Sequence, residues 1–349
     1  MSAARPMLIA LAAVMTTTAM AAPASKPKEQ PQPPPPAATA SVPQPPGSDP
    51  DLAFGAFQRG HYLTAFAEAT KRVEASGDAK AMTLIGELYA DGLGVPRNDQ
   101  QAATWYQLAA DRGDRNAMFA LAAFRMVGRA GPRDRDAAAK LFAAAAKLGH
   151  PAAAYNLGLL YLEGQLFPQD FKRAAELVRI AAEAGVPEAQ YALATFYKEG
   201  RGVDKDPREA ARLLGAAALA GNTDAEIEYG IALFNGAGVA KNEIAAFSYM
   251  MKAARKGSAI AQRRLAFMYA TGRGVKADPV QAARWHLIAR AGGDNDQFLD
   301  DFLRKMKPED RAAGEDAAKP WIARLAAATK TSASPFPDPV LPPTPPTQP

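Results

Sequence analysis

The sequence predicts an all-α protein built as an array of helix pairs, and two observations carry that prediction. Six alanines recur every 36 residues without an insertion: Ala81, Ala117, Ala153, Ala189, Ala225 and Ala261. A fixed period of a few tens of residues is typical of stacked supersecondary units, which present a long binding surface. The composition agrees, since 48% of residues are hydrophobic and 22% are charged, while strand-like stretches of apolar β-branched residues are missing.

The first residues, 1–21, have the features of a cleaved secretory signal. Arg5 precedes an apolar run from Met7 to Met15, and Ala19-Met20-Ala21 supplies the small residues that a signal peptidase reads. We expect cleavage after Ala21 and a periplasmic or secreted protein. The run is shorter than the roughly 20 residues that span a bilayer, so we expect no stable membrane insertion.

Proline-rich segments flank the array on both sides. Residues 22–50 contain 11 prolines between Pro23 and Pro50, and residues 331–349 contain 8 between Pro335 and Pro349. Because proline lacks a backbone donor and these segments have few apolar side chains, we predict disordered, extended linkers. Such tails can also be ligands for aromatic grooves, although composition favours a spacer.

One repeat unit accommodates two helices and two turns. Ala81, Ile85, Leu88 and Tyr89 fall on one face of a first helix. A glycine follows each first helix, where positive φ commonly closes the last turn: Gly92, Gly128, Gly164, Gly200, Gly236 and Gly272. A short acceptor precedes each second helix, as an N-cap requires: Asn98, Asp134, Asp170, Asp206, Asn242 and Asp278.

These residues resemble the Sel1-like repeat family, relatives of the tetratricopeptide repeat. In the first unit the family pattern is carried by Ala81, Gly86, Tyr89, Gly92, Gly94, Val95, Trp105, Tyr106, Ala109 and Ala110. The resemblance implies a right-handed α-α superhelix with six repeats over residues 79–296. Two units depart from the pattern, because Arg129-Ala130-Gly131-Pro132 and Gln165-Leu166-Phe167-Pro168 replace the second glycine and valine. We expect altered turns there.

The array is expected to have a cap at each end. Residues 51–78 read as a helix pair joined near Arg59-Gly60-His61, and residues 297–330 read as two further helices. Terminal units of this kind shield the last hydrophobic face of a repeat array from water.

The candidate partner-binding residues lie at positions where the residue type is not constant from repeat to repeat. In the related tetratricopeptide fold the first helices line the concave face, and the residues two, six and nine places after each alanine project away from the packing face. The candidates are Phe119, Met126, Tyr155, Leu159, Leu162, Tyr191, Lys198, Ile227 and Phe234. They form either an apolar groove for a peptide or a buried seam between successive first helices.

Catalytic signals are poor. The three histidines, His61, His150 and His286, lie at turns or replace a repeat residue, and the absence of cysteine excludes a thiol nucleophile, a lipoprotein anchor and disulfides. No metal-ligand spacing or nucleophile elbow occurs, so we expect no enzyme, metal or cofactor. The net charge of +5 is spread over both signs, which indicates no nucleic-acid partner.

The sequence therefore favours an exported protein-protein interaction scaffold of the cell envelope that holds a peptide or protein segment. A glycan or cell-wall binding module is the alternative, because the same aromatic side chains could stack on sugar rings. An enzyme is a third and weaker interpretation, since a solenoid can hold a site that no motif reveals.

Overall fold

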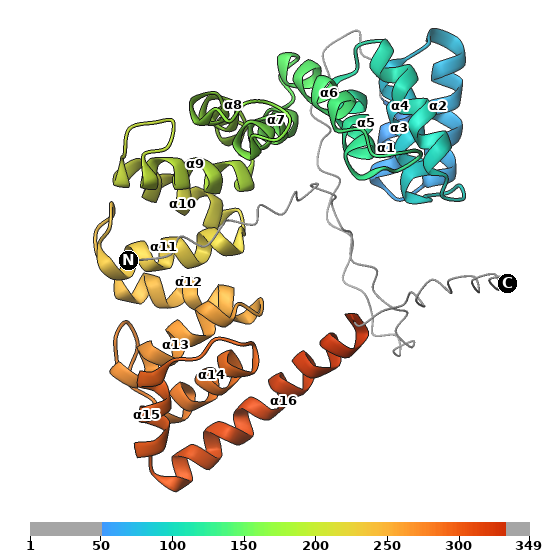
Figure 1. The fold of residues 1–349 in the computed structure, drawn as a ribbon. Coiled ribbons are helices and arrows are strands. Elements are labelled where there is room, and N and C mark those ends of the chain that lie inside the picture. The colour runs from blue at the N-terminus through green and yellow to red at the C-terminus, as the bar shows by residue number, and fades with distance from the viewer. Residues whose placement is uncertain (1–50, 333–349) are drawn as a thin grey trace, which may run out of the picture. The chain divides into compact units, whose positions relative to one another are not determined.

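The computed structural model describes residues 51–332, and within that range the protein has sixteen helices and no strand (Figure 1). The prediction of an all-α protein is confirmed. The chain divides into two compact units, one ending at Gln169 and one beginning at Asp170. The predicted signal and both proline-rich segments, apart from the last residues of the final helix, lie outside the described residues.

The first unit has seven helices in its described part, residues 51–169, and each packs against the next along the chain. They are α1 (Leu52–Gln58), α2 (Tyr62–Ser76), α3 (Ala79–Asp91), α4 (Asp99–Asp111), α5 (Arg115–Val127), α6 (Arg135–Lys147) and α7 (Pro151–Glu163).

The second unit has nine helices among its described residues. They are α8 (Phe171–Glu183), α9 (Pro187–Glu199), α10 (Pro207–Leu219), α11 (Thr223–Asn235), α12 (Glu243–Arg255), α13 (Ala259–Thr271), α14 (Pro279–Ala291), α15 (Gln297–Lys305) and α16 (Pro308–Ser332). Helices α8 to α14 pack in sequence, and α16 closes the unit by packing on α14, where the rings of Trp285 and Trp321 lie 5.9 Å apart.

The predicted helix ends are confirmed at all six repeats. Each glycine that follows a first helix is left-handed, as at Gly236 with φ of 74°. Each predicted N-cap side chain accepts a backbone N–H from the first turn, as Asn242 does from Ala245 at 2.9 Å. One such cap contributes about 1 kcal/mol, so every repeat carries its own start and stop signals.

The second glycine of the turn has a packing role that the repeat pattern did not reveal. At Gly238 an added Cβ would lie 1.9 Å from the carbonyl oxygen of Pro207, at the start of the second helix of the preceding repeat. In the altered turn of the second repeat this position is Ala130, the only non-glycine residue between 51 and 332 with positive φ, at 61°. This strained residue stands in the turn beside the cavity described below.

The repeat alanines are fully or almost fully buried, with exposed fractions of 0–4%. Around them lie large core side chains such as Ile85 and Phe142 in the first unit and Met250 and Leu265 in the second. The alanines mark packing positions because only a small side chain lets neighbouring helices approach there.

Candidate functional site

The first unit contains an open cavity of about 330 Å³ between its second and third repeats. Three helices and one turn line it: Phe119, Ala123, Met126 and Val127 come from α5, Phe142 from α6, Asn156 from α7 and Arg133 from the turn before α6. Two candidate residues, Phe119 and Met126, therefore meet in one hollow, together with Ala123 between them. A volume of this size admits a bulky side chain of a ligand.

Phe119 is held in a stack of rings at one side of this cavity. Its centroid lies 5.8 Å from that of Phe142 and 4.5 Å from the imidazole of His150, which is nearly parallel to it. Phe142 and Met126 are buried, each 2% exposed, whereas Phe119 is half-buried. The floor of the cavity is thus fixed by the core, and Phe119 remains available to a ligand.

Two polar side chains, Arg133 and Asn156, line the cavity. Arg133 is exposed and has no hydrogen bond or ion pair to any residue in the range 51–332. Asn156 is 5% exposed, and its Nδ2 donates to the carbonyl oxygen of Ala152 at 2.8 Å. An apolar hollow with a few polar groups is typical of a binding site.

His150 contacts both the cavity residue Phe119 and the first turn of α7. Its Nδ1 accepts the backbone N–H of Ala153 at 3.1 Å, so the ring caps the helix in its neutral form. Burial, followed by the positive charge of Arg115, lowers the pKa of His150, while the charge of Asp114 opposes the shift. The histidine is a structural residue at the site.

We predict that acidification weakens this cap. Because the folded pKa is depressed, the unfolded chain binds the proton more readily, so the contribution of His150 is present above about pH 6.5 and is lost as pH falls below it. Urea unfolding between pH 7.5 and 5 should show a loss of up to about 1 kcal/mol in the wild type relative to His150→Asn, which keeps a capping oxygen without titrating. Parallel pH profiles for the two proteins would contradict this assignment.

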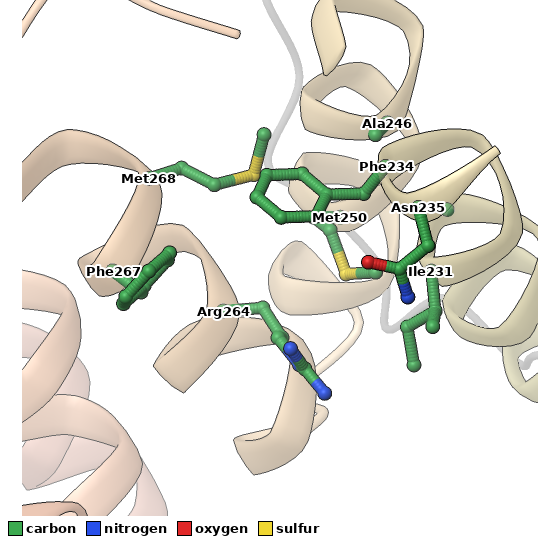
Figure 2. A pocket seen from close by; sticks show the side chains of 9 residues that line it. Ile231, Phe234, Asn235, Ala246, Met250, Arg264, Phe267 and Met268 are labelled. Atoms are coloured by element: carbon green, nitrogen blue, oxygen red, sulfur yellow. The ribbon is translucent and has the colours of Figure 1, made fainter. Parts of the chain in front are cut away.

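The second unit has a hollow at the same repeat position, three repeats further along the chain. Figure 2 shows its lining, which comes from α11, α12 and α13: Gly230, Ile231, Phe234, Asn235, Ala246, Met250, Arg264, Phe267 and Met268. Five lining positions of the first cavity recur here after 108 residues, as Ile231, Phe234, Asn235, Met250 and Arg264. Ile231, Phe234 and Arg264 are larger than Ala123, Met126 and Asn156 at the corresponding positions, and only about 20 Å³ remains.

The remaining candidates in the first unit differ in burial. Leu159 is 3% exposed and belongs to the core, whereas Tyr155 and Leu162 are half-buried. Leu159 and the buried Met126 therefore fit the second interpretation, in which the candidate positions form a buried seam between successive first helices. The half-buried side chains remain accessible to a partner.

The candidates in the second unit divide in the same way. Ile227 is buried at 8% exposure, and Tyr191 is half-buried, where burial raises its pKa to about 12. Lys198 is exposed and forms an ion pair with Glu228 at 2.7 Å. Phe234 is half-buried under the guanidinium of Arg273, 3.9 Å from the ring centroid.

One acidic residue occupies the cavity position one repeat earlier. Glu87 stands on α3 where Ala123 stands on α5, and it is half-buried with no ion pair in the described part of the chain. Burial, followed by the charges of Asp91 and Asp114, raises the pKa of Glu87 to about 7. The first-helix surface of this unit therefore changes from acidic in the first repeat to apolar in the second.

The other two histidines also have structural positions. His61 precedes α2 and its side chain makes no capping bond, and His286 is 1% exposed with its Nε2 2.7 Å from Oδ1 of Asp300. Between residues 51 and 332 no three His, Cys, Asp or Glu side chains gather as a metal site would require. Among the helices of the same residues, none combines the length and the apolar character that a membrane span requires.

Helix pairs of constant length, joined by repeated turns, define an α-solenoid of the kind that binds other proteins. The Sel1 repeat model matches six consecutive segments: 79–114, 115–150, 151–186, 187–222, 223–258 and 259–294. The chain belongs to the Sel1 repeat family.

The chain is similar to solved structures of Sel1 repeat proteins, of which two are described here. A Sel1 repeat protein from Oxalobacter formigenes is 26% identical, with a TM-score of 0.58 over 71% of this chain and 99% of its own. A protective antigen of uropathogenic Escherichia coli strains, which displays the same fold, is 26% identical, with a TM-score of 0.56 over 84% of this chain and 72% of its own. No curated protein sequence matches the chain.

Proposed function

We propose that the protein is an exported, non-catalytic scaffold of the cell envelope, which binds a segment of a partner protein through the cavity between α5, α6 and α7. The observation that carries the proposal is the open volume of about 330 Å³ at predicted groove positions. A segment bound there places one bulky apolar side chain in the cavity, against Phe119 and Phe142. Such an anchor supplies most of the affinity in peptide recognition.

The lining of the cavity favours a peptide over a glycan. Sugar rings need polar partners for their hydroxyl groups, whereas only Arg133 and Asn156 supply them here. One face of the Phe119 ring is already covered by His150, which leaves less of it for stacking on a sugar. The experiment that tests the proposal therefore also measures retention of the protein on cell-wall material.

Filling the cavity should abolish partner binding. Ala123 is half-buried in the lining, so Ala123→Trp places an indole in the space that the partner's side chain would take. Ala143→Trp is the matched control, because Ala143 is exposed on α6 next to Phe142. Pull-downs from the envelope of the native cell should lose their protein partner with Ala123→Trp, by roughly tenfold or more in recovery, since a lost anchor typically costs 2 kcal/mol or more.

Both variants are first compared by urea unfolding to establish that they fold. A folded Ala123→Trp protein that retains every partner would refute the cavity as the binding site. A variant carrying Phe119→Ala, Tyr155→Ala and Tyr191→Ala extends the comparison. Loss of retention on cell-wall material alone, with protein partners kept, would support the glycan alternative.

Export predicts a defined mature N-terminus. Protein recovered from the periplasm or the medium should begin at Ala22, because the small residues Ala19 and Ala21 direct the peptidase and Pro23 obstructs a cut after the following residue. N-terminal sequencing and fractionation measure this directly. An unprocessed start at Met1 in the cytoplasmic fraction would contradict export.

A further inference from the structure

Arg264 is a cation without a counter-charge in the hollow of the second unit. It is half-buried on α13, and Figure 2 shows its side chain between those of Phe267 and Ile231. Its Nε is buried and has no hydrogen-bond acceptor. Among residues 51–332 the guanidinium has no ion pair or ring contact either.

The repeat register explains why the counter-charge is missing. Arg264 occupies the position that Glu228 has one repeat earlier, and there Glu228 is neutralised by Lys198 at 2.7 Å. In the next repeat the position of Lys198 is taken by Phe234. The lysine and glutamate of the ion pair are thus replaced by Phe234 and Arg264.

The nearest acidic side chains are already occupied. The single Nε–H of Arg263 is shared by both carboxylate oxygens of Asp294, each 3.0 Å from Nε, and Oδ2 of Asp296 lies 3.4 Å from Nη1 of the same residue. Burial, followed by the charge of Arg263, lowers the pKa of Arg264, and the two aspartates offset this only in part. A partly desolvated cation in this state gains free energy from a carboxylate supplied by a ligand.

An aromatic surface runs past Arg264. The ring centroids of Phe234 and Phe267 are 6.5 Å apart, and those of Phe267 and Phe298 are 5.6 Å apart. Phe298, on α15, is 50% exposed although it is a large hydrophobic residue. One exposed and two half-buried aromatic rings near an arginine have the composition of an interface hot spot.

We propose that Arg264 and the rings of Phe234, Phe267 and Phe298 form a second recognition site, which binds a peptide carboxylate next to an apolar side chain. The carboxylate meets the guanidinium, and the apolar side chain lies along the rings. Because the hollow holds only about 20 Å³, the bound segment lies across its mouth and only carboxylate oxygens reach inward. This inference rests on the proposed function, since it assigns the chemistry of a peptide ligand in the second unit.

Three short peptides test this site on the full chain. The first is acetyl-Ala-Phe-Asp-Ala-amide, the second replaces its Asp with Asn, and the third is acetyl-Ala-Ala-Phe with a free terminal carboxylate. The methyl groups of Met250 and Met268, which line the hollow, report binding by NMR in protein labelled at methionine. Titrations of the three probes compare a side-chain carboxylate, its neutral counterpart and a chain terminus.

We expect a carboxylate probe to bind about tenfold more tightly than the Asn probe, as a charge-assisted hydrogen bond provides. Arg264→Gln should remove this discrimination while the Asn probe binds as before, and Arg264→Lys should keep part of it. Tighter binding of the Asp probe would show that the site binds a side-chain carboxylate. Tighter binding of the third probe would show that it binds the carboxylate of a chain terminus. Equal binding of all three probes, or discrimination that survives Arg264→Gln, would overturn the proposal.

Ala123→Trp separates this inference from the proposed function. The substitution lies in the first unit, so it should leave the discrimination between the Asp and Asn probes unchanged. If Ala123→Trp keeps its partners while Arg264→Gln loses discrimination, the cavity proposal fails and the carboxylate site stands. If Ala123→Trp loses its partners while Arg264→Gln keeps the discrimination, only the carboxylate site is refuted.

Discussion

Replacing Gly238 with alanine should destabilise the second unit by at least about 2 kcal/mol more than the same change at Gly221. Both glycines are left-handed, with φ of 72° and 89°. The Cβ added at Gly238 would lie 1.9 Å from the carbonyl oxygen of Pro207, whereas the one added at Gly221 meets nothing within 4 Å. Gly221→Ala therefore has only the conformational cost, and Gly238→Ala also pushes the turn away from α10.

Urea unfolding followed by circular dichroism measures both variants against the wild type. A shift of the Gly238→Ala midpoint well below that of Gly221→Ala supports close packing between the turn and the preceding repeat. Equal midpoints would mean that the turn relaxes without cost, and the second glycine would then serve only the backbone conformation.

Lys256→Met should be strongly destabilising, because it leaves a buried carboxylate without its cation. Glu226 is 2% exposed, and both of its carboxylate oxygens lie 2.9 Å from Nζ of Lys256, which also donates to the carbonyl oxygen of Gly221. Breaking one side of a buried pair costs about 3–5 kcal/mol. Lys256 is partly exposed, so we expect about 3 kcal/mol, at the lower end of that range.

The double variant Glu226→Met and Lys256→Met is the matched control. Removing both charges leaves no uncompensated carboxylate, and packing by apolar side chains of similar length should restore much of the lost stability. Urea midpoints of Glu226→Met, Lys256→Met and the double variant complete a double-mutant cycle, which measures the interaction between the two side chains. A Lys256→Met protein as stable as the wild type would show that the buried carboxylate needs no cation.

The fold could be predicted from the sequence because its signals are local. A left-handed glycine, an Asn or Asp N-cap and an alanine at a packing position each act within one turn of helix, and six copies in phase leave no ambiguity. Two of the candidate residues chosen by register, Phe119 and Met126, line the first cavity, and their role in binding a partner stays a prediction.

Burial at those register positions could not be predicted, because it depends on side chains from other helices. Ile227 is in the core, while Phe119 at the same position is half-buried under His150. The two hollows differ in volume because Ala123 is followed three repeats later by Ile231, and Asn156 by Arg264. Such differences arise from pairs of residues 30 or more positions apart.

The second role of the turn glycine was missed for the same reason. Nothing near Gly238 in the sequence points to the carbonyl of Pro207, which belongs to the preceding repeat. Arg129 and Arg273 likewise occupy one register position and form ion pairs with Asp99 and Glu243 of the preceding repeats. Each arginine follows its acidic partner at the same sequence separation, and this repeated spacing could have predicted the ion pairs.

Photo-crosslinking from position 123 in the native cell tests the central claim most directly. A photoreactive phenylalanine in place of Ala123 lies inside the cavity of the first unit, and the same residue in place of Ala143 lies outside it on α6. The proposed function predicts an adduct with an envelope protein from position 123 and none from position 143. Identical adducts from both positions, or none from position 123, would contradict it.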